Sequence, residues 1–215
     1  MTKITAPKYD EFYAAGGWKY RPDFEMKFLG EMTAAAGLAE GSEIVEIGCG
    51  QGFHAKILHD LGFTVTANDL SQEGIAFAKT NYEGPDYHAG DAADFLSGIE
   101  PESVDAVFIR GMSWFHYKFT DDRPLAAKRM MPRIARIVKP GGAILLMIKT
   151  DYTGTETAGG VYNHLWTDFP ALLGDYGTIT RMTDWRGMVL NSEEDGRASG
   201  HGMSVVVKTE GASGG

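Results

Sequence analysis

The chain has 215 residues, of which 43% are hydrophobic and 23% are charged, and these ordinary values exclude a mainly disordered protein. Its 29 acidic and 20 basic residues give a net charge of −9, which argues against non-specific binding to nucleic acid or to anionic lipid. Because Cys49 is the single cysteine, the chain cannot form an internal disulfide or a metal site made of several cysteines.

The first 40 residues are rich in aromatic side chains and contain one helix-like segment, Asp23–Ala36. We expect residues 1–40 to form a small helical cap or lid, with Phe24 and Phe28 packed on the main domain. Three further aromatic residues of this segment could either pack or cover a bound ligand: Tyr13, Trp18 and Tyr20.

From residue 42 onward, short apolar runs alternate with amphipathic segments. The apolar runs predict five strands: Glu43–Ile47, Thr64–Ala67, Tyr87–His88, Val104–Ile109 and Ala143–Ile148. The segments between them predict three helices: Phe53–Leu61, Gln72–Asn81 and Pro124–Val138. The last helix is expected to kink or restart at Pro132 and to end at the Lys-Pro-Gly-Gly stretch that follows it. Alternating strands and helices predict an α/β fold in residues 42–150, with a doubly wound, mostly parallel sheet.

Residues 151–210 show a different pattern. A polar, glycine-rich loop, Asp151–Asn163, follows the fifth strand and is predicted to shape a ligand pocket together with Trp166 and Phe169. Two extended runs, about 176–188 and 203–209, show no convincing helix between them and predict an antiparallel pair at the sheet edge. The glycine-rich residues 211–215 are expected to be disordered. The chain as a whole, 1–215, is therefore predicted to be one domain.

A glycine-rich turn joins the first strand to the first helix and reads E-I-G-C-G-Q-G from Glu46 to Gly52. Glycines let the backbone turn sharply and let a ligand approach, and the helix that follows offers unpaired N–H groups. A dinucleotide turn would need a third glycine at the position of Phe53, which disfavours a nicotinamide-dependent oxidoreductase. Asp69 and Asp91 follow the next two strands, where they could accept hydrogen bonds from a ribose and from the amino group of an adenine.

The segments VEIGCGQG, ANDLS, HAGDA, VDAVFIR and KPGGAILLM, in this order and spacing, resemble the class I S-adenosylmethionine-dependent methyltransferases over residues 42–150. The resemblance implies a Rossmann-like, seven-stranded sheet whose last strand is antiparallel, and S-adenosyl-L-methionine as the cofactor. It also implies the following contacts: Gly48, Gly50 and Gly52 against the methionine part, which Glu46 helps to orient; Asp69 on the ribose; Leu70 beside the adenine; Asp91 and Ala92 at its edge. In this family an N-terminal segment often folds over the cofactor, so Tyr20 and Arg21 are candidate contacts.

The segment after the fourth strand carries the candidate catalytic residues. His116 is the best-placed general base for a hydroxyl or amine acceptor, and Tyr117 lies beside it, although both could be partly buried structural residues. Arg110 could bind a carboxylate or phosphate of the acceptor, or the carboxylate of the cofactor. It could equally form a structural ion pair with Asp105 or Glu46.

No metal site is expected, because the histidines lack ligand spacing, and His88, His164 and His201 are predicted at the surface or in caps. The chain lacks the N-P-P-[YFW] signature of many methyltransferases that act on bases or glutamine. It also lacks the acidic residue with which catechol-type enzymes bind magnesium after the fourth strand.

These absences favour methyl transfer to an O or N atom of a small-molecule acceptor. The alternatives are a protein or RNA methyltransferase of the same fold, and a non-catalytic cofactor-binding subunit. Basic residues cluster between Lys118 and Arg136, but their helical spacing is typical of the solvated face of one helix. With no signal-peptide-like start and no apolar run long enough to span a bilayer, we expect a cytoplasmic monomer or homodimer with no nucleic-acid or membrane partner.

Overall fold

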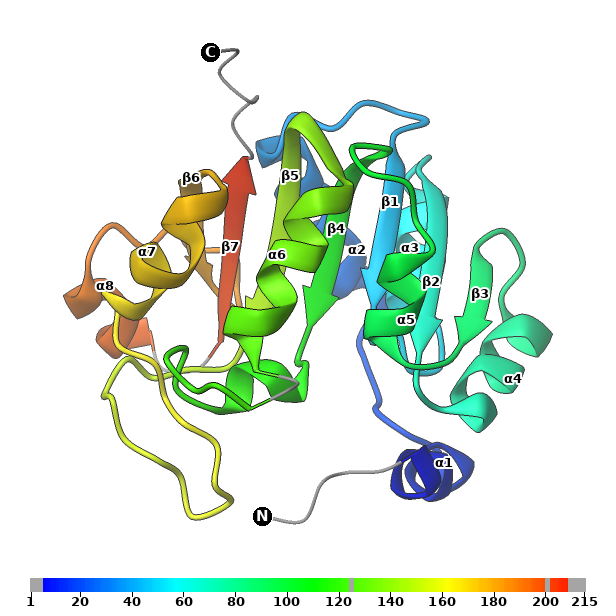
Figure 1. Cartoon of the computed structure of the whole chain (residues 1–215), viewed down its shortest axis with the longest axis horizontal. Coiled ribbons are helices and arrows are strands. Elements are labelled where there is room, and N and C mark those ends of the chain that lie inside the picture. The colour runs from blue at the N-terminus through cyan, green and yellow to red at the C-terminus, as the bar shows by residue number, and fades with distance from the viewer. Residues whose placement is uncertain (1–5, 124–125, 200–201, 209–215) are drawn as a thin grey trace.

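The computed structural model describes residues 6–123, 126–199 and 202–208 (Figure 1). Its centre is one seven-stranded sheet with the strand order β3-β2-β1-β4-β5-β7-β6. The strands are β1 (Glu43–Ile47), β2 (Thr64–Asp69), β3 (Asp86–Ala89), β4 (Val104–Arg110), β5 (Val138–Ile148), β6 (Thr178–Asp184) and β7 (Met203–Lys208). Strands β1 to β5 pair in parallel, whereas β7 lies antiparallel between β5 and β6. The predicted fold class is therefore confirmed, including the antiparallel last strand.

Helices cover both faces of the sheet, as Figure 1 shows. They are α1 (Ala6–Ala14), α2 (Pro22–Ala35), α3 (Phe53–Asp60), α4 (Gln72–Asn81), α5 (Ala92–Ser97), α6 (Ala127–Ile137), α7 (Asp168–Leu173) and α8 (Glu193–Ser199), with short 3₁₀ turns η1 (Ser113–His116) and η2 (Gly174–Tyr176). Buried side chains of α2, α3 and α4 form the core on one face, and those of α5, α6 and α7 form the core on the other. Strand β4 is almost entirely buried, which fits its nearly continuous apolar sequence.

Helix α1 lies apart from both helical layers, beyond the carboxyl ends of the parallel strands (Figure 1). It packs against α4. The sequence did not predict α1, because only one of its residues, Tyr13, is buried and it has no apolar stripe at helical spacing.

The C-terminal third differs from the prediction in two helices. Helix α8 lies between β6 and β7, where no helix was predicted, and only Gly196 of its seven residues is buried. Helix α7 is short and was also missed. The predicted antiparallel pair at the sheet edge is confirmed by the pairing of β6 with β7.

Helix α6 and strand β5 follow each other without a loop. The helix runs through Pro132 as one element and ends at Ile137, within one residue of the predicted end. Strand β5 starts at Val138, so the Lys-Pro-Gly-Gly stretch belongs to the strand. A register shift in the pairing with β4, between Val104 and Ala106, accommodates this irregular start. The predictions for Pro124, His201 and residues 211–215 lie outside the described residues.

Candidate functional site

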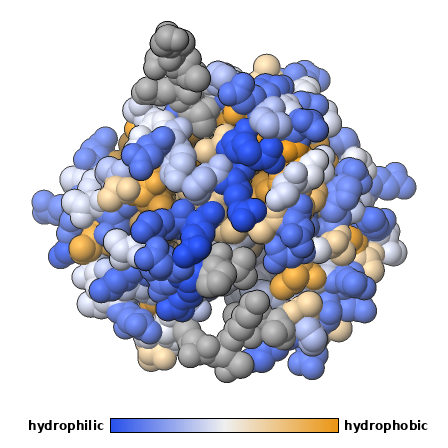
Figure 2. All heavy atoms as spheres, in the orientation of Figure 1, coloured by the Kyte–Doolittle hydropathy of each residue, from blue (hydrophilic) through white to orange (hydrophobic). Residues whose placement is uncertain are grey.

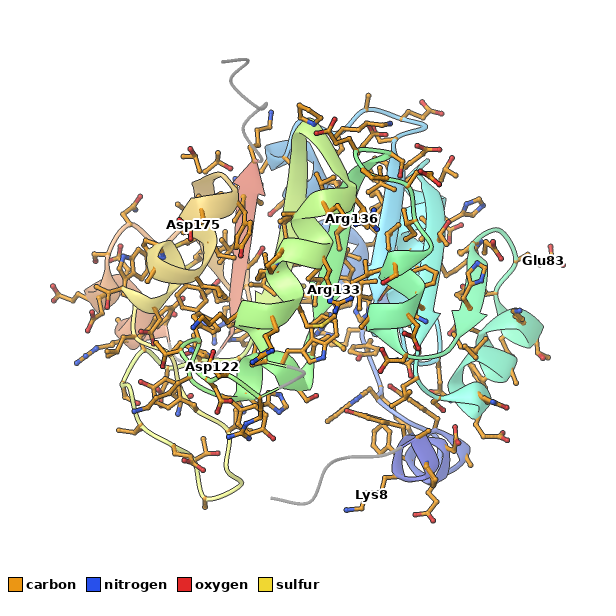
Figure 3. The ribbon with its side chains drawn as sticks, in the orientation of Figure 1. Lys8, Glu83, Asp122, Arg133, Arg136 and Asp175 are labelled. Atoms are coloured by element: carbon orange, nitrogen blue, oxygen red, sulfur yellow. The ribbon has the colours of Figure 1, made fainter. Side chains whose placement is uncertain are left out.

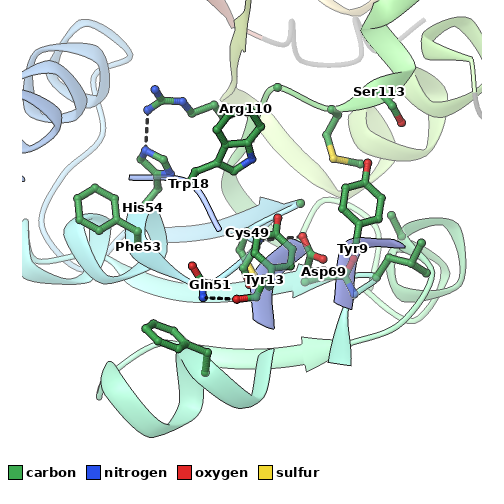
Figure 4. A pocket seen from close by; sticks show the side chains of 18 of the residues that line it. Tyr9, Tyr13, Trp18, Cys49, Gln51, Phe53, His54, Asp69, Arg110 and Ser113 are labelled. Atoms are coloured by element: carbon green, nitrogen blue, oxygen red, sulfur yellow. Dashed lines mark hydrogen bonds between the residues drawn. The ribbon is translucent and has the colours of Figure 1, made fainter. Parts of the chain in front are cut away.

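A cavity of about 790 Å³ lies at the carboxyl ends of the parallel strands (Figure 4). Its walls come from the turns after β1, β2, β3 and β4, and from the N-terminal segment before α2. Nine of the thirteen residues predicted to bind the cofactor or to catalyse line it: Tyr20, Gly48, Gly50, Asp69, Leu70, Asp91, Ala92, Arg110 and His116. Four others do not: Arg21, Glu46, Gly52 and Tyr117.

The three glycines of the turn after β1 serve two different purposes. All three have positive φ angles, which favour glycine. Gly48 and Gly50 line the cavity, and a Cβ atom there would come within 2.2 Å of the Met112 sulfur and within 2.6 Å of the Tyr13 hydroxyl, respectively. Gly52 lies behind the cavity, where a Cβ atom would meet Ala78 and Tyr87 at 2.7 Å. Gly52 is therefore required for the close packing of the glycine turn against α4 and β3.

Asp69 holds the glycine turn in place from the end of β2. Its two carboxylate oxygens accept hydrogen bonds from the backbone N–H groups of Gly50 and Ser71, both at 2.8 Å. Burial raises the pKa of the Asp69 carboxyl, and these backbone hydrogen bonds oppose the shift. A carboxylate can accept about four hydrogen bonds, so these two bonds leave capacity for hydroxyl groups of a ligand. Leu70 lines the cavity next to it.

Asp91 stands at the equivalent position after β3. Its Oδ1 atom caps α5 by accepting hydrogen bonds from the backbone N–H groups of Ala93, at 2.8 Å, and Asp94, at 3.4 Å. Asp91 and Ala92 both line the cavity. The Asp91 side chain therefore has a structural role in the N-cap as well as a place in the cavity wall.

Glu46 is buried beneath the glycine turn and does not reach the cavity. Its Oε2 atom has no hydrogen-bond partner among the described residues. Burial, together with the negative charge of Asp69, raises the pKa of Glu46 to about 8. The Glu46 carboxyl thus lies behind the wall to which Asp69 belongs, and a cationic ligand in the cavity would lower the free energy cost of ionising both groups.

Arg110 belongs to a network that the sequence did not reveal. Its Nη1 atom donates to Glu25 of α2 and to Nε2 of His54 at the start of α3, both at 2.6 Å. The Arg110 guanidinium also lies 4.8 Å from the centre of the Tyr20 ring. Burial opposes ionisation of Glu25, but the hydrogen bond and the positive charge of Arg110 outweigh it, and the pKa of Glu25 is lowered to about 2. Burial lowers the pKa of His54 to about 4, so the ring is neutral near pH 7 and accepts from Arg110.

The expected structural partners of Arg110 were therefore wrong, since neither Asp105 nor Glu46 bonds to it. Asp105 lies at the opposite end of β4, where it accepts from Lys139 and from the backbone N–H of Glu43. Arg110 lines the cavity, and a guanidinium has five N–H donors, so the bonds through Nη1 do not exhaust it. The network fixes a cation in the cavity wall (Figure 4).

The 3₁₀ turn η1 presents His116 to the cavity, together with Ser113 and Trp114. Burial lowers the pKa of the His116 ring, so it is neutral near pH 7 and able to accept a proton. Tyr117 faces elsewhere, because its ring lies under the Arg123 guanidinium at 3.8 Å. Arg21 is exposed and precedes α2.

Helix α1 contributes Tyr9 and Tyr13 to the cavity wall (Figure 4). Asp10 accepts from the Ser71 hydroxyl and from the backbone N–H of Glu73, which ties α1 to the start of α4. Gln51 Nε2 donates to the Tyr13 carbonyl at 3.3 Å. These contacts of α1 could not be read from the sequence, because they join residues that are far apart in it.

Several further aromatic residues line the cavity and were not predicted as site residues: Phe53, Phe77, Tyr82 and Trp114. Trp18 also lines it and is 65% exposed. By contrast, the loop 151–163, Trp166 and Phe169 contribute nothing to the cavity wall, contrary to expectation. Phe169 lies in the core, because it packs against Phe119 and His164.

His164, predicted at the surface or in a cap, is fully buried, so the surface position was wrong, whereas its Nε2 atom bonds to the Phe115 carbonyl at the end of η1. His88 is half-buried and pairs with Asp86 at 2.8 Å. Within the described ranges, no group of three or more His, Cys, Asp or Glu side chains is arranged to hold a metal ion. No helix in the described part of the chain is both long and apolar enough to cross a membrane.

Comparison with known proteins gives a consistent result. Residues 45–146 match the model of a family described as a methyltransferase domain. A malonyl-[acyl-carrier protein] O-methyltransferase of Pectobacterium atrosepticum is 28% identical over 130 residues, which are 60% of this chain and 46% of that protein. A fatty-acid O-methyltransferase of Mycolicibacterium smegmatis is 31% identical over 117 residues, or 53% and 39% of the two chains. The match thus spans less than half the length of either relative.

Solved structures share the fold over most of the chain. A TehB-like S-adenosylmethionine-dependent methyltransferase of Corynebacterium glutamicum aligns with a TM-score of 0.60 and 19% identity, covering 96% of each chain. An S-adenosylmethionine-dependent methyltransferase of Clostridium acetobutylicum aligns with a TM-score of 0.66 and 16% identity, covering 96% of this chain and 98% of that one. A phosphoethanolamine N-methyltransferase of Haemonchus contortus, solved with S-adenosyl-L-methionine, gives 0.63 and 19%, covering 97% and 58%.

Proposed function

Because residues 45–146 match a methyltransferase-domain family and the chain shares the fold of S-adenosylmethionine-dependent methyltransferases, we propose that it is a class I enzyme of this kind, which transfers a methyl group to an O or N atom of a small-molecule acceptor bound in the 790 Å³ cavity. Both curated relatives are named as O-methyltransferases, which favours oxygen. The observation that carries the proposal is that a single cavity contains the glycine turn, Asp69 at the end of β2, Asp91 after β3, and the neutral His116.

The residues of the cavity fit the proposed cofactor, S-adenosyl-L-methionine. When bound, it supplies a methyl group on a sulfonium centre, which is open to displacement by a nucleophile. Gly48 and Gly50 line the part of the cavity where its methionine part would lie, and the buried acids Glu46 and Asp69 favour its positive charge. Asp69 would accept from the ribose, Leu70 would flank the adenine, and Asp91 with Ala92 would bind the adenine edge.

Arg110 and Tyr20 would complete this side of the site. The network with Glu25 and His54 holds the guanidinium in the cavity wall, where its remaining donors can bind a carboxylate. Helix α1 would act as the lid over the cofactor, since Tyr13 lies against Gly50 of the glycine turn and Tyr9 also lines the cavity. Arg21, Gly52 and Tyr117 would have structural roles, because none of them lines the cavity.

His116 would remove the proton of the acceptor as methyl transfer proceeds. A neutral imidazole can accept this proton, and the lowered pKa of His116 keeps it neutral near pH 7. Holding the acceptor in line with the methyl group supplies much of the rate acceleration in a displacement of this kind. The aromatic walls formed by Trp18, Phe53 and Trp114 favour an acceptor with an apolar part.

The structure gives less support to an RNA or protein acceptor. The basic residues of α6 lie on its outer face, where hydrophilic side chains gather (Figure 2), and none of them lines the cavity. Arg133 and Arg136 extend from α6 toward α5, as Figure 3 shows, and Arg136 donates to the carbonyls of Leu96 and Ile99. These side chains therefore stabilise the packing of two helices.

The test is a transfer assay with a labelled methyl group and three acceptor sets: fatty and short-chain carboxylic acids, phenols and alcohols, and amines. We expect label in at least one small-molecule set, and we expect His116→Ala to reduce the rate without changing cofactor affinity. Arg133→Ala is the matched control, because its side chain lies outside the cavity. Cofactor binding with no label in any small molecule, but with label in RNA or protein, would refute the small-molecule assignment.

A further inference from the structure

His164 is a polar residue in an apolar part of the core. Its ring is stacked on Phe119, with centroids 3.8 Å apart, and contacts the ring edges of Tyr162 and Phe169. The side chain is fully buried and does not line the cavity. Burial of a polar ring costs free energy unless its nitrogen atoms form hydrogen bonds, so the hydrogen-bond partners of His164 decide what its position costs.

One ring nitrogen is committed to the turn that carries His116. His164 Nε2 lies 2.7 Å from the carbonyl oxygen of Phe115, and because a carbonyl can only accept, Nε2 must carry the proton. Nδ1 is then unprotonated, and it has no hydrogen-bond partner among the described residues. The Asp168 carboxylate is 3.7 Å from Nδ1 and accepts instead from the backbone N–H of Leu165.

The segment that contains His164 also binds the carbonyl of His116, the residue after Phe115 in η1. The backbone N–H of Tyr162 donates to the His116 carbonyl at 2.8 Å. The last carbonyls of a short helix have no partner within it, so η1 depends on neighbouring groups for these bonds. Tyr162 and His164 together satisfy the carbonyls of two consecutive residues, Phe115 and His116.

We propose that His164 is a positioning residue, which fixes the end of η1 through the Phe115 carbonyl and thereby sets the orientation of the His116 ring in the cavity. The inference rests on the proposed function only in taking His116 as the base. It gives the loop 151–163 and the residues after it a role that the lining of the cavity does not show. Through Tyr162 and His164, this segment binds the backbone of the turn that carries the candidate base, His116.

Two substitutions separate the hydrogen bond from the volume of the side chain. His164→Gln can place an amide N–H near the position of Nε2, whereas His164→Leu fills the space and leaves the buried Phe115 carbonyl without a donor. His59→Gln is the matched control, because His59 lies on α3 and does not line the cavity.

The first readout is a histidine NMR titration, which does not require turnover. In the unaltered protein, nitrogen shifts should show His164 as the neutral Nε2–H tautomer, and His116 should titrate below its ordinary value of about 6.5. The groups that act on His164 are Asp168, His116 and the Phe115 carbonyl. The Tyr162 ring also contacts the His164 ring, and the Lys118 ammonium lies 5.4 Å from the centre of the Tyr162 ring.

We expect His164→Leu to move the His116 titration upward, because a loosened turn lets water reach the ring. His164→Gln and His59→Gln should leave the titration in place. In the transfer assay, His164→Leu should lower kcat about 10–100-fold, with the KM for the cofactor changed by less than about twofold. His164→Gln should restore most of kcat.

Three results would overturn the inference: an Nδ1–H tautomer of His164 in the unaltered protein, an unmoved His116 titration in folded His164→Leu, or equal losses in the Leu and Gln variants. A different result would refute the role of His116 in the proposed function and leave this inference standing. If His116→Ala keeps its turnover while His164→Leu still moves the His116 titration, then His164 positions His116 but His116 is not the base.

Discussion

The raised pKa of Glu46 predicts how many protons are released when the cofactor binds. Its pKa is about 8 in the structure, so at pH 7 about 0.9 of the side chains carry a proton. A cation bound over the glycine turn favours the charged carboxylate and lowers this pKa. If the pKa falls below about 6, binding of S-adenosyl-L-methionine releases about 0.8–0.9 proton at pH 7, and the release shrinks as the pH rises above 8.

The assay is titration calorimetry of S-adenosyl-L-methionine in buffers of different ionisation enthalpy at one pH. The slope of the observed enthalpy against the buffer enthalpy gives the number of protons released. Glu46→Gln keeps the shape of the side chain but cannot ionise, so its slope should be close to zero. S-adenosylhomocysteine lacks the sulfonium charge and should release fewer protons. The same slope in the unaltered protein and in Glu46→Gln would refute this account of Glu46.

Three further predictions concern the cavity and its cover. Asp69→Asn should weaken S-adenosylhomocysteine binding in calorimetry by about 1–3 kcal/mol, because it removes charge-assisted hydrogen bonds, and an unchanged affinity would contradict the ribose assignment. His116→Ala should lower kcat about 10²–10⁴-fold. Because burial lowers the pKa of this base, the rate of the unaltered protein should fall only below about pH 6.5, and near-normal turnover of the variant would exclude a base role. Asp10→Ala should speed amide hydrogen exchange in α1, since it removes the bonds to the start of α4; unchanged exchange would show that other contacts hold α1.

The sequence predicted those parts of the site that depend on local patterns. The glycine turn lies between β1 and α3. Asp69 is the last residue of β2, and Asp91 follows β3. In a parallel sheet these positions meet at one edge, so their grouping follows from strand order alone. The seven-stranded sheet with its antiparallel last strand followed from the same alternation and from the family resemblance.

The remaining features depend on contacts between distant residues. Arg110 bonds to Glu25 and His54, which lie 85 and 56 positions away, and no spacing rule connects them. Helices α1 and α8 bury too few side chains to show an apolar stripe. His164 was expected at the surface or in a cap, as is usual for a lone histidine, and only its contacts with Phe119 and the Phe115 carbonyl show that it is buried.

The central claim is that the cavity binds an S-adenosyl cofactor, and thermal unfolding tests it most directly. A ligand at 100 times its Kd stabilises the folded state by about 2.7 kcal/mol, which for a chain of this size raises Tm by roughly 5–11 °C. We predict this rise with S-adenosylhomocysteine and none with NADH. A rise with NADH alone, or no rise with S-adenosylhomocysteine at saturating concentration, would contradict the claim.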